Sequence, residues 1–107
     1  MIKLIKSGIA GKNWYRKYSD GWIEQGGYVG AEIGTDDKTI NPVEFNIPFL
    51  NKPLSIRTTV NAKGTGASGG TMLLVVEPTI TKTGFGVVND SYGSSDCVGY
   101  FWEASGY

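Results

Sequence analysis

The sequence predicts an all-β protein, a small antiparallel β-sandwich of six to seven strands. Glycine supplies 16 of the 107 residues, about twice the ~7% of ordinary proteins, and the glycines gather between runs of β-branched and aromatic residues. These runs recur at short intervals with Gly, Pro, Asn or Asp at the breaks, as in sandwiches and barrels. No segment carries apolar residues at helical spacing over three turns with capping residues at its ends.

The predicted strands belong to one domain, residues 13–107, which is small for a self-sufficient core. They lie at 13–18, 22–29, 43–48, 54–62, 71–77, 83–88 and 98–105. Residues 1–12 contain lysine and glycine and are poorly patterned. We therefore expect them to be a lead-in from an upstream segment, or a tail that a partner orders.

The Asp-Gly dipeptide at 20–21 predicts a tight hairpin between the first two strands, because a two-residue type I′ turn needs positive φ at both central positions. This turn places Lys17 opposite Glu24 as a cross-strand ion pair and lays the Trp14 ring over the bare backbone of Gly27. Both faces of the hairpin then carry aromatic and charged side chains together.

Two explanations of this two-faced hairpin stay open. In the first, it is half-buried on each side and its long charged side chains bend to solvent at the rims. In the second, it lies at a protein–protein interface, where Tyr, Trp and Arg are enriched, and sharing a core with other copies stabilises a small domain. The interface candidates are Trp14, Tyr15, Tyr18, Trp22 and Trp102, with Trp22 and Trp102 also candidates for the core.

Composition argues against several classes of function. The net charge is +0 and the sequence pI is about 6.2, so no basic stripe is available for nucleic acid. No apolar run reaches the ~18 residues of a membrane span. The chain has no histidine and one cysteine, Cys97, so it lacks the commonest general base, an internal disulfide and a Cys/His zinc site. We expect no enzyme activity and no cofactor, and interpret Cys97 as a small filler beside a loop.

The segment 89–96 combines the residue types that recognise sugars, namely planar hydrogen-bonding groups beside an aromatic ring that can stack on a sugar. The candidate residues for receptor binding are Asn89, Asp90, Tyr92, Asp96 and, from a separate strand, Arg57. Tyr92 is explained about as well as a turn aromatic packed on its own sheet.

The acidic residues allow two weaker interpretations. Asp90 with Asp96 could form the carboxylate pair of a glycosidase. The same two residues, or Asp36 and Asp37 with Thr35, could offer oxygen ligands to calcium. Aspartates that hydrogen-bond the backbone of their own turns explain both groups better, so we predict neither catalysis nor a metal site.

Four motifs, in order along residues 13–107, resemble the C-terminal domain of tail fibres from tailed phages and prophages. They are WYRKYSDGWIEQGG at 14–27, F-x-I-P-F at 45–49, T-x-T-G-F at 81–85 and FWEASGY at 101–107. The ending also resembles that of H-type lectin domains. Some of those lectins hold a metal with histidines on a three-fold axis, a feature that is not carried over because this chain has no histidine.

The resemblance implies a homotrimer in which the upstream chain forms a shaft and this domain is the knob at the distal end of a virion's tail fibre, assembled in the host cytoplasm. Such knobs adsorb to bacterial surface polysaccharide, lipopolysaccharide or an outer-membrane protein. Cyclic assembly also explains the two-faced hairpin as a heterologous, ring-closing contact. Two rivals stay open: a free-standing H-type-like lectin, and a structural domain that caps the trimer without a receptor site.

Strand direction gives one expectation about which turns face away from a shaft. If strands alternate in direction from a shaft-side start at residue 13, the distal turns are 19–21, 49–53 and 78–82. Loops 63–70 and 89–97 then point back toward the shaft, in conflict with the receptor site predicted above, unless a Greek-key connection intervenes.

Overall fold

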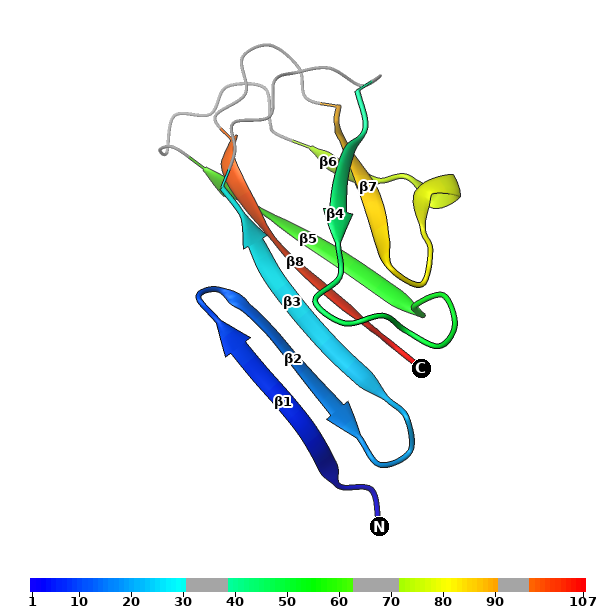
Figure 1. The fold of residues 1–107 in the computed structure, drawn as a ribbon. Coiled ribbons are helices and arrows are strands. Elements are labelled where there is room, and N and C mark those ends of the chain that lie inside the picture. Colours follow the sequence, from blue (N-terminus) through cyan, green and yellow to red (C-terminus); the bar gives the residue numbers. More distant parts are fainter. Residues whose placement is uncertain (31–38, 63–71, 91–96) are drawn as a thin grey trace.

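The computed structural model describes residues 1–30, 39–62, 72–90 and 97–107. Its elements are β1 Leu4–Ala10, β2 Asn13–Tyr18, β3 Ile23–Val29, β4 Asn41–Glu44, β5 Ser55–Ala62, β6 Leu73–Val75, the short 3-10 helix η1 Glu77–Thr79, β7 Gly84–Asn89 and β8 Cys97–Gly106. The strands form two antiparallel sheets, a large one in the order β1-β2-β3-β8-β5 and a small one in the order β4-β7-β6 (Figure 1). The predicted all-β class, with two antiparallel sheets, is confirmed.

The seven predicted strands are present, and two of them are shorter than expected. The strand predicted at 43–48 ends at Glu44, after which the backbone N–H of Phe45 donates to the Thr83 carbonyl at 2.9 Å. In the described part of 71–77, strand structure ends at Val75. Pro78 follows in the first turn of η1, a position where its missing N–H needs no partner.

β1 is the strand that the sequence did not predict. It pairs antiparallel with β2, from Ala10 opposite Asn13 to Leu4 opposite Tyr18, with an irregularity at Ile5. None of its residues is buried, so it shows no clean alternation of inward apolar and outward polar side chains. The prediction that the domain begins at residue 13 is therefore corrected: the sheet begins with β1.

The β2–β3 hairpin turns through three residues instead of the two predicted. The backbone N–H of Gly21 donates to the Tyr18 carbonyl at 3.0 Å, and that of Tyr18 donates to the Trp22 carbonyl at 2.9 Å. Gly21 has a φ of 92°. A turn closed in this way, followed by a glycine in the left-handed region, is the usual three-residue hairpin loop with a bulge.

The extra loop residue moves the pairing by one position. Trp14 lies opposite Gly26, the glycine before the predicted one, and Arg16 lies opposite Glu24. The expected Lys17–Glu24 ion pair is wrong, and Arg16 takes its place with 3.9 Å between Nε and the Glu24 Oε1. The predicted packing of the Trp14 ring over a glycine is present, with Gly26 in place of Gly27. A Cβ on Gly26 would lie 2.8 Å from the indole Nε1.

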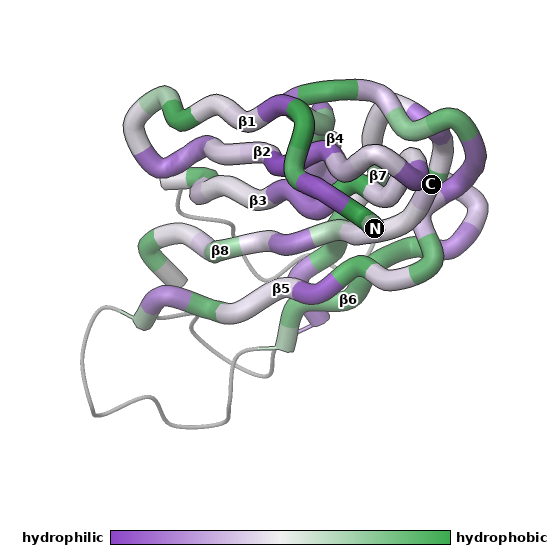
Figure 2. Tube along the Cα trace, turned by 90° about the horizontal axis from the view of Figure 1, so that it is seen from below, coloured by the Kyte–Doolittle hydropathy of each residue, from purple (hydrophilic) through white to green (hydrophobic). Residues whose placement is uncertain are grey.

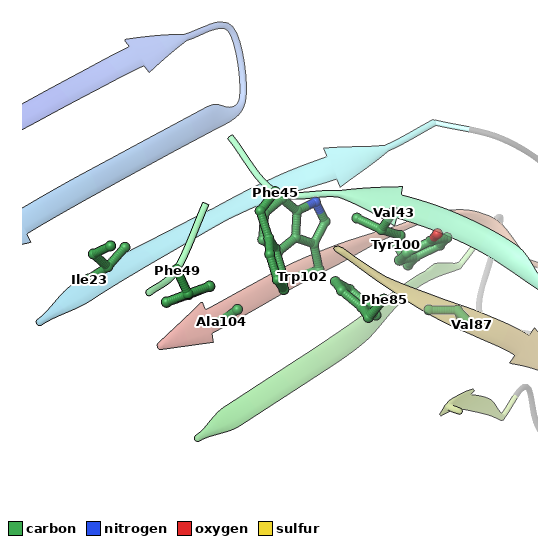
Figure 3. Close-up of a cluster of buried hydrophobic side chains, with 9 residues drawn as sticks. All are labelled: Ile23, Val43, Phe45, Phe49, Phe85, Val87, Tyr100, Trp102 and Ala104. Carbon is green, nitrogen blue, oxygen red and sulfur yellow. The ribbon is translucent and has the colours of Figure 1, made fainter. Parts of the chain in front are cut away.

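The core lies between β3 and β8 of the large sheet and β4 and β7 of the small sheet (Figure 3). Its buried members are Ile23, Val43, Phe45, Phe49, Phe85, Val87, Tyr100, Trp102 and Ala104. Trp102 is 3% exposed, and its ring centroid lies 5.7 Å from that of Phe45 and 5.9 Å from that of Phe85. Trp102 therefore fills the core, which corrects its prediction as a subunit-interface residue.

Both chain ends lie at one end of the sandwich, beside the β2–β3 turn (Figures 1 and 2). The backbone N–H of Lys3 donates to Ser19 Oγ at 2.9 Å, and the backbone N–H of Ser19 returns a 2.7 Å bond to the Lys3 carbonyl. At the other terminus, the Tyr107 carbonyl accepts a 2.9 Å bond from the backbone N–H of Asn51. The Tyr107 ring packs edge-on against Trp22, with 5.1 Å between centroids.

Candidate functional site at the loop end and the outer face

The first candidate region is the end of the sandwich opposite the chain termini, which we call the loop end. Strands β3, β5 and β7 finish there and β8 starts there, at Val29, Ala62, Asn89 and Cys97 (Figure 1). Because β1 adds one reversal of direction, the expectation about distal turns is reversed. The turn at 19–21, which was expected to be distal, lies beside the termini. The strand ends that flank 63–70 and 89–97, the loops expected to face a shaft, lie at the opposite end of the sandwich.

The receptor residues predicted from segment 89–96 divide into three groups. Asn89 is the last residue of β7 and is 0% exposed, so its side chain faces inward and cannot contact a receptor, which corrects that part of the prediction. Asp90 is exposed, and its backbone N–H donates to the Met72 carbonyl at 2.9 Å. Tyr92 and Asp96 lie outside the described residues.

Arg57 lies far from the loop end. It is near the start of β5, and its Nη2 lies 3.1 Å from Oε2 of Glu103, in a pair whose side chains are 76% and 53% exposed. Glu103 is six residues along β8 from Cys97, or about 20 Å at the usual strand rise. The structure therefore does not bring Arg57 together with Asp90.

The second candidate region is the outer face of the large sheet, the side that points away from the small sheet. Alternation along β2 and β3 places Trp14 and Tyr18 on this face, and Trp22 joins them opposite Tyr18. Tyr15 lies on the opposite side, with its ring against Gly8. Three of the five predicted interface aromatics therefore share the outer face.

Charged side chains are paired around the outer-face aromatics. The Arg16 guanidinium lies 4.7 Å from the centroid of the Trp14 ring, within cation–π range. The Tyr18 hydroxyl donates to Glu24 at 2.9 Å, and this hydrogen bond to the carboxylate raises the pKa of Tyr18 above its ordinary value of 10.0. Trp14, Tyr18 and Trp22 are each half-buried without a second layer over them, so their remaining surface is available to a partner.

A further aromatic cluster on the outer face was not singled out from the sequence. The rings of Tyr28 and Phe101 lie 4.8 Å apart, and Lys12 Nζ sits 4.3 Å from the Tyr28 centroid. Asn61 Nδ2 donates to the Tyr28 hydroxyl at 2.8 Å, and Phe101 is 43% exposed. The alternation along 98–105 was the available signal, since it separates Phe101 from the core side chain of Trp102.

The possible metal sites are only partly within the described part of the chain. There, no group of three Cys, Asp or Glu side chains could hold a metal ion. Thr35, Asp36 and Asp37, the alternative calcium ligands, lie outside it. In the same described ranges, no helix is long and apolar enough to cross a membrane.

A two-layer β-sandwich with an uncovered aromatic sheet face is a module suited to binding or assembly. The family to which the chain belongs narrows this class of module to tail fibres. Residues 17–107 match the family described as "Putative tail fiber protein gp53-like, C-terminal", and the chain belongs to this family. The predicted resemblance to tail-fibre C-terminal domains is thereby confirmed.

Solved structures with the same fold come from pyocin tail fibres. The N-truncated R1-type pyocin tail fibre is 24% identical, with a TM-score of 0.69 over 96% of this chain and 87% of that one. The R1 pyocin fibre of P. aeruginosa comprising C-terminal residues 323–701 is 25% identical, with a TM-score of 0.71 over 95% and 28% of the two chains.

A sequence relative is the uncharacterized protein MJ0347 of Methanocaldococcus jannaschii, 35% identical over 97 residues. The alignment covers 89% of this chain, and the chain spans 63% of the length of that relative.

Proposed function

We propose that this chain is the receptor-binding tip of a bacteriophage or prophage tail fibre, and that it adsorbs as a homotrimer to a bacterial surface glycan or outer-membrane component. The observation that carries the proposal is the position of the loop end opposite the N-terminus (Figure 1). A shaft that joins at the N-terminus, next to Ser19, leaves the loop end pointing outward from the fibre. The proposed role is binding, without a catalytic step or a cofactor.

The proposed receptor contacts are the polar and aromatic residues of segment 90–96. Asp90 is exposed at the start of this segment, and the sequence adds Tyr92 and Asp96, which suit hydrogen bonding to sugar hydroxyls and stacking on a sugar ring. Arg57 is left out of the contact set because it lies about 20 Å along the sheet from the loop end.

The proposed homotrimer is supported by the outer face of the large sheet. Trp14, Tyr18 and Trp22 keep aromatic surface exposed there, with their charged neighbours already paired. Aromatic residues of this kind are enriched in the buried centre of protein interfaces, where charges are depleted.

The test is an adsorption assay with a whole fibre that carries the triple change Asp90→Ala, Tyr92→Ala and Asp96→Ala. We expect adsorption to host cells to fall at least tenfold while light scattering still reports a trimer. The matched control is Asn51→Ala with Lys52→Ala, exposed turn residues at the end of the sandwich where the termini lie. Unchanged adsorption of an intact triple-variant trimer would refute the receptor role and favour a structural domain that only caps the trimer.

A further inference from the structure

The neutral chain is divided into a basic arm and an acidic body. Residues 1–19, which we call the hairpin arm, contain β1 and β2 and carry five of the ten cationic residues and none of the ten acidic ones. The rest of the chain, which we call the body, carries the other five cations and all ten acids, for a net charge of −5. Charge asymmetry of this size along one chain is a signal for association with a complementary surface.

The hairpin arm is uncovered on both faces. The small sheet does not extend over β1 and β2 (Figure 1), and no residue of either strand is buried. Single lysines separate pairs of hydrophobic residues along its start (Figure 2). Its most exposed aliphatic side chains are Ile9 at 84%, Ile2 at 64%, Ile5 at 60% and Leu4 at 51%. Exposed aliphatic side chains gathered in this way mark a surface suited to a partner.

Two lysines of the arm face each other, and neither forms an ion pair with the described residues. Lys6 lies directly opposite Lys17 in the β1–β2 ladder, and like charges in that position destabilise a strand pair. Among the described residues, the ion pairs are made by Arg16 and Arg57, and neither of these lysines takes part. A carboxylate from another molecule would relieve this repulsion.

A surface of matching character lies on the outside of the small sheet, and we call it the acidic hollow. It has a volume of about 380 Å³. Its lining includes Ile40, Pro42, Glu44, Thr79, Gly84 and Gly86. The glycines of β7 leave its floor without side chains, and Ile40 on its wall is 47% exposed.

Glu44 belongs to the lining of this hollow, and Glu77 lies two residues before Thr79 of the lining. Glu44 pairs opposite Gly84 in the β4–β7 ladder. Glu77 follows Val76, whose backbone N–H donates to the Gly86 carbonyl at 3.0 Å. Both glutamates are exposed and are outside the ion pairs of the described residues.

We propose that the hairpin arm of one copy of this chain docks in the acidic hollow of a neighbouring copy. The edge of β1 enters the hollow, bringing Ile5 to its apolar floor and the Lys6–Lys17 pair to Glu44 and Glu77. This inference rests on the proposed homotrimer and adds the two surfaces that meet in it. The arm and the hollow are different patches of one chain. Each copy therefore inserts its own arm into one neighbour and accepts the arm of the other neighbour in its hollow, which is the heterologous contact that closes a cyclic ring.

Charge complementarity favours a second copy over an anionic membrane or lipid phosphate. A phosphate surface would explain the lysines of the arm but would leave the acidic hollow without a role. A second copy satisfies both, since the lysines of each arm meet Glu44 and Glu77 of a neighbouring copy. Burying the exposed aliphatic residues of β1 adds an apolar contribution that a purely electrostatic contact with phosphate lacks.

The test is a charge-reversal cycle in the full chain, with the mass in solution measured by light scattering after size exclusion. The arm variant is Lys6→Glu with Lys17→Glu, and the hollow variant is Glu44→Lys with Glu77→Lys. The arm variant keeps two like charges opposite each other, so the repulsion between these two positions is preserved. We expect each variant to raise the trimer dissociation constant at least tenfold, and the combined variant to recover most of that loss.

The control is Lys52→Glu, a single charge reversal at an exposed turn outside both surfaces, and circular dichroism verifies that every variant is folded. A wild-type chain that stays monomeric at all concentrations would overturn the homotrimer and this docking with it. A wild-type trimer that neither variant weakens would overturn the docking alone, as would two weakened variants without recovery in combination. Binding of the wild type to phosphatidylglycerol vesicles that only the arm variant loses, with trimers unaffected, would assign the arm to an anionic surface instead.

Discussion

Replacing Trp102 by alanine measures how much of the stability depends on the aromatic centre of the core. The side chain is 3% exposed and packs against Phe45 and Phe85, which come from the opposite layer of the sandwich (Figure 3). Truncating a buried Trp to Ala costs about 3–5 kcal/mol, out of roughly 5–15 kcal/mol for a whole domain. We expect the unfolding free energy, from chemical denaturation followed by far-ultraviolet circular dichroism, to fall by about 4 kcal/mol.

The matched control is Trp14→Ala, which removes the same side chain from the outer face, where it is half-buried. At a fixed protein concentration low enough to keep both variants monomeric, Trp14→Ala is expected to cost less than half as much. A loss below about 1 kcal/mol for Trp102→Ala would be far outside the range for a buried aromatic residue. It would refute the core assignment and return Trp102 to the list of interface residues.

Three further predictions concern β2 and β3 of the large sheet. Gly26→Ala places a Cβ 2.7 Å from a backbone oxygen of β8, so thermal denaturation is expected to show a loss of about 1–3 kcal/mol; a stabilised variant would contradict the close packing. Gln25→Leu leaves the N–H and C=O of Ile47 without the bonds of 3.1 and 2.8 Å that the buried amide makes. Chemical denaturation is expected to register about 1–3 kcal/mol, and a neutral result would mean that water replaces the amide. Because the bond to Glu24 raises the pKa of Tyr18 above 10.0, its contribution to stability is complete below pH 10.0 and is lost as pH rises through the folded pKa. Tyr18→Phe is expected to flatten that alkaline decline in unfolding titrations, and an identical decline in both proteins would refute the linkage.

The sequence predicted those strands whose burial alternates, and it missed the strand that buries nothing. β3 and β8 place Ile23 and Trp102 inward and polar neighbours outward, so their pattern reveals both the strand and its face. β1 carries exposed isoleucines and lysines on an edge, and it is held mainly by backbone pairing with β2, which leaves no alternating pattern in the sequence. Missing one strand also reversed every expectation about which turns lie beside the N-terminus.

The register of the β2–β3 hairpin depends on whether its loop has two or three residues, and the Asp-Gly dipeptide alone does not determine this length. An Asp-Gly pair suits a two-residue loop, and it also suits a three-residue loop in which only Gly21 needs positive φ. The second arrangement is the one found, and it moved the ion pair of Glu24 from Lys17 to Arg16. The presence of the hairpin was therefore predictable, whereas its exact pairing was not.

The sequence predicted which residue types form the candidate regions, but only partly where these residues lie in the fold. Trp14 and Trp102 look alike as sequence, and each lies over a glycine of the Gly26-Gly27 pair, from opposite faces of β3. Which of them is core depends on where the small sheet packs, and this is decided by contacts between distant residues. Asn89 read as a loop residue because it is polar, yet it ends β7 inside the sandwich.

The meeting of both termini beside the β2–β3 turn makes this domain suitable for display and grafting. A fluorescent label or a scaffold fused at either end is held on the side of Ser19 and Tyr107, about the length of a β8 strand from Asp90. Library residues inserted between Ala62 and Met72 would then alter neither the fusion joint nor the aromatic core. A change of the proposed receptor-binding loops and a change of carrier can in this way be engineered separately in the same small sandwich.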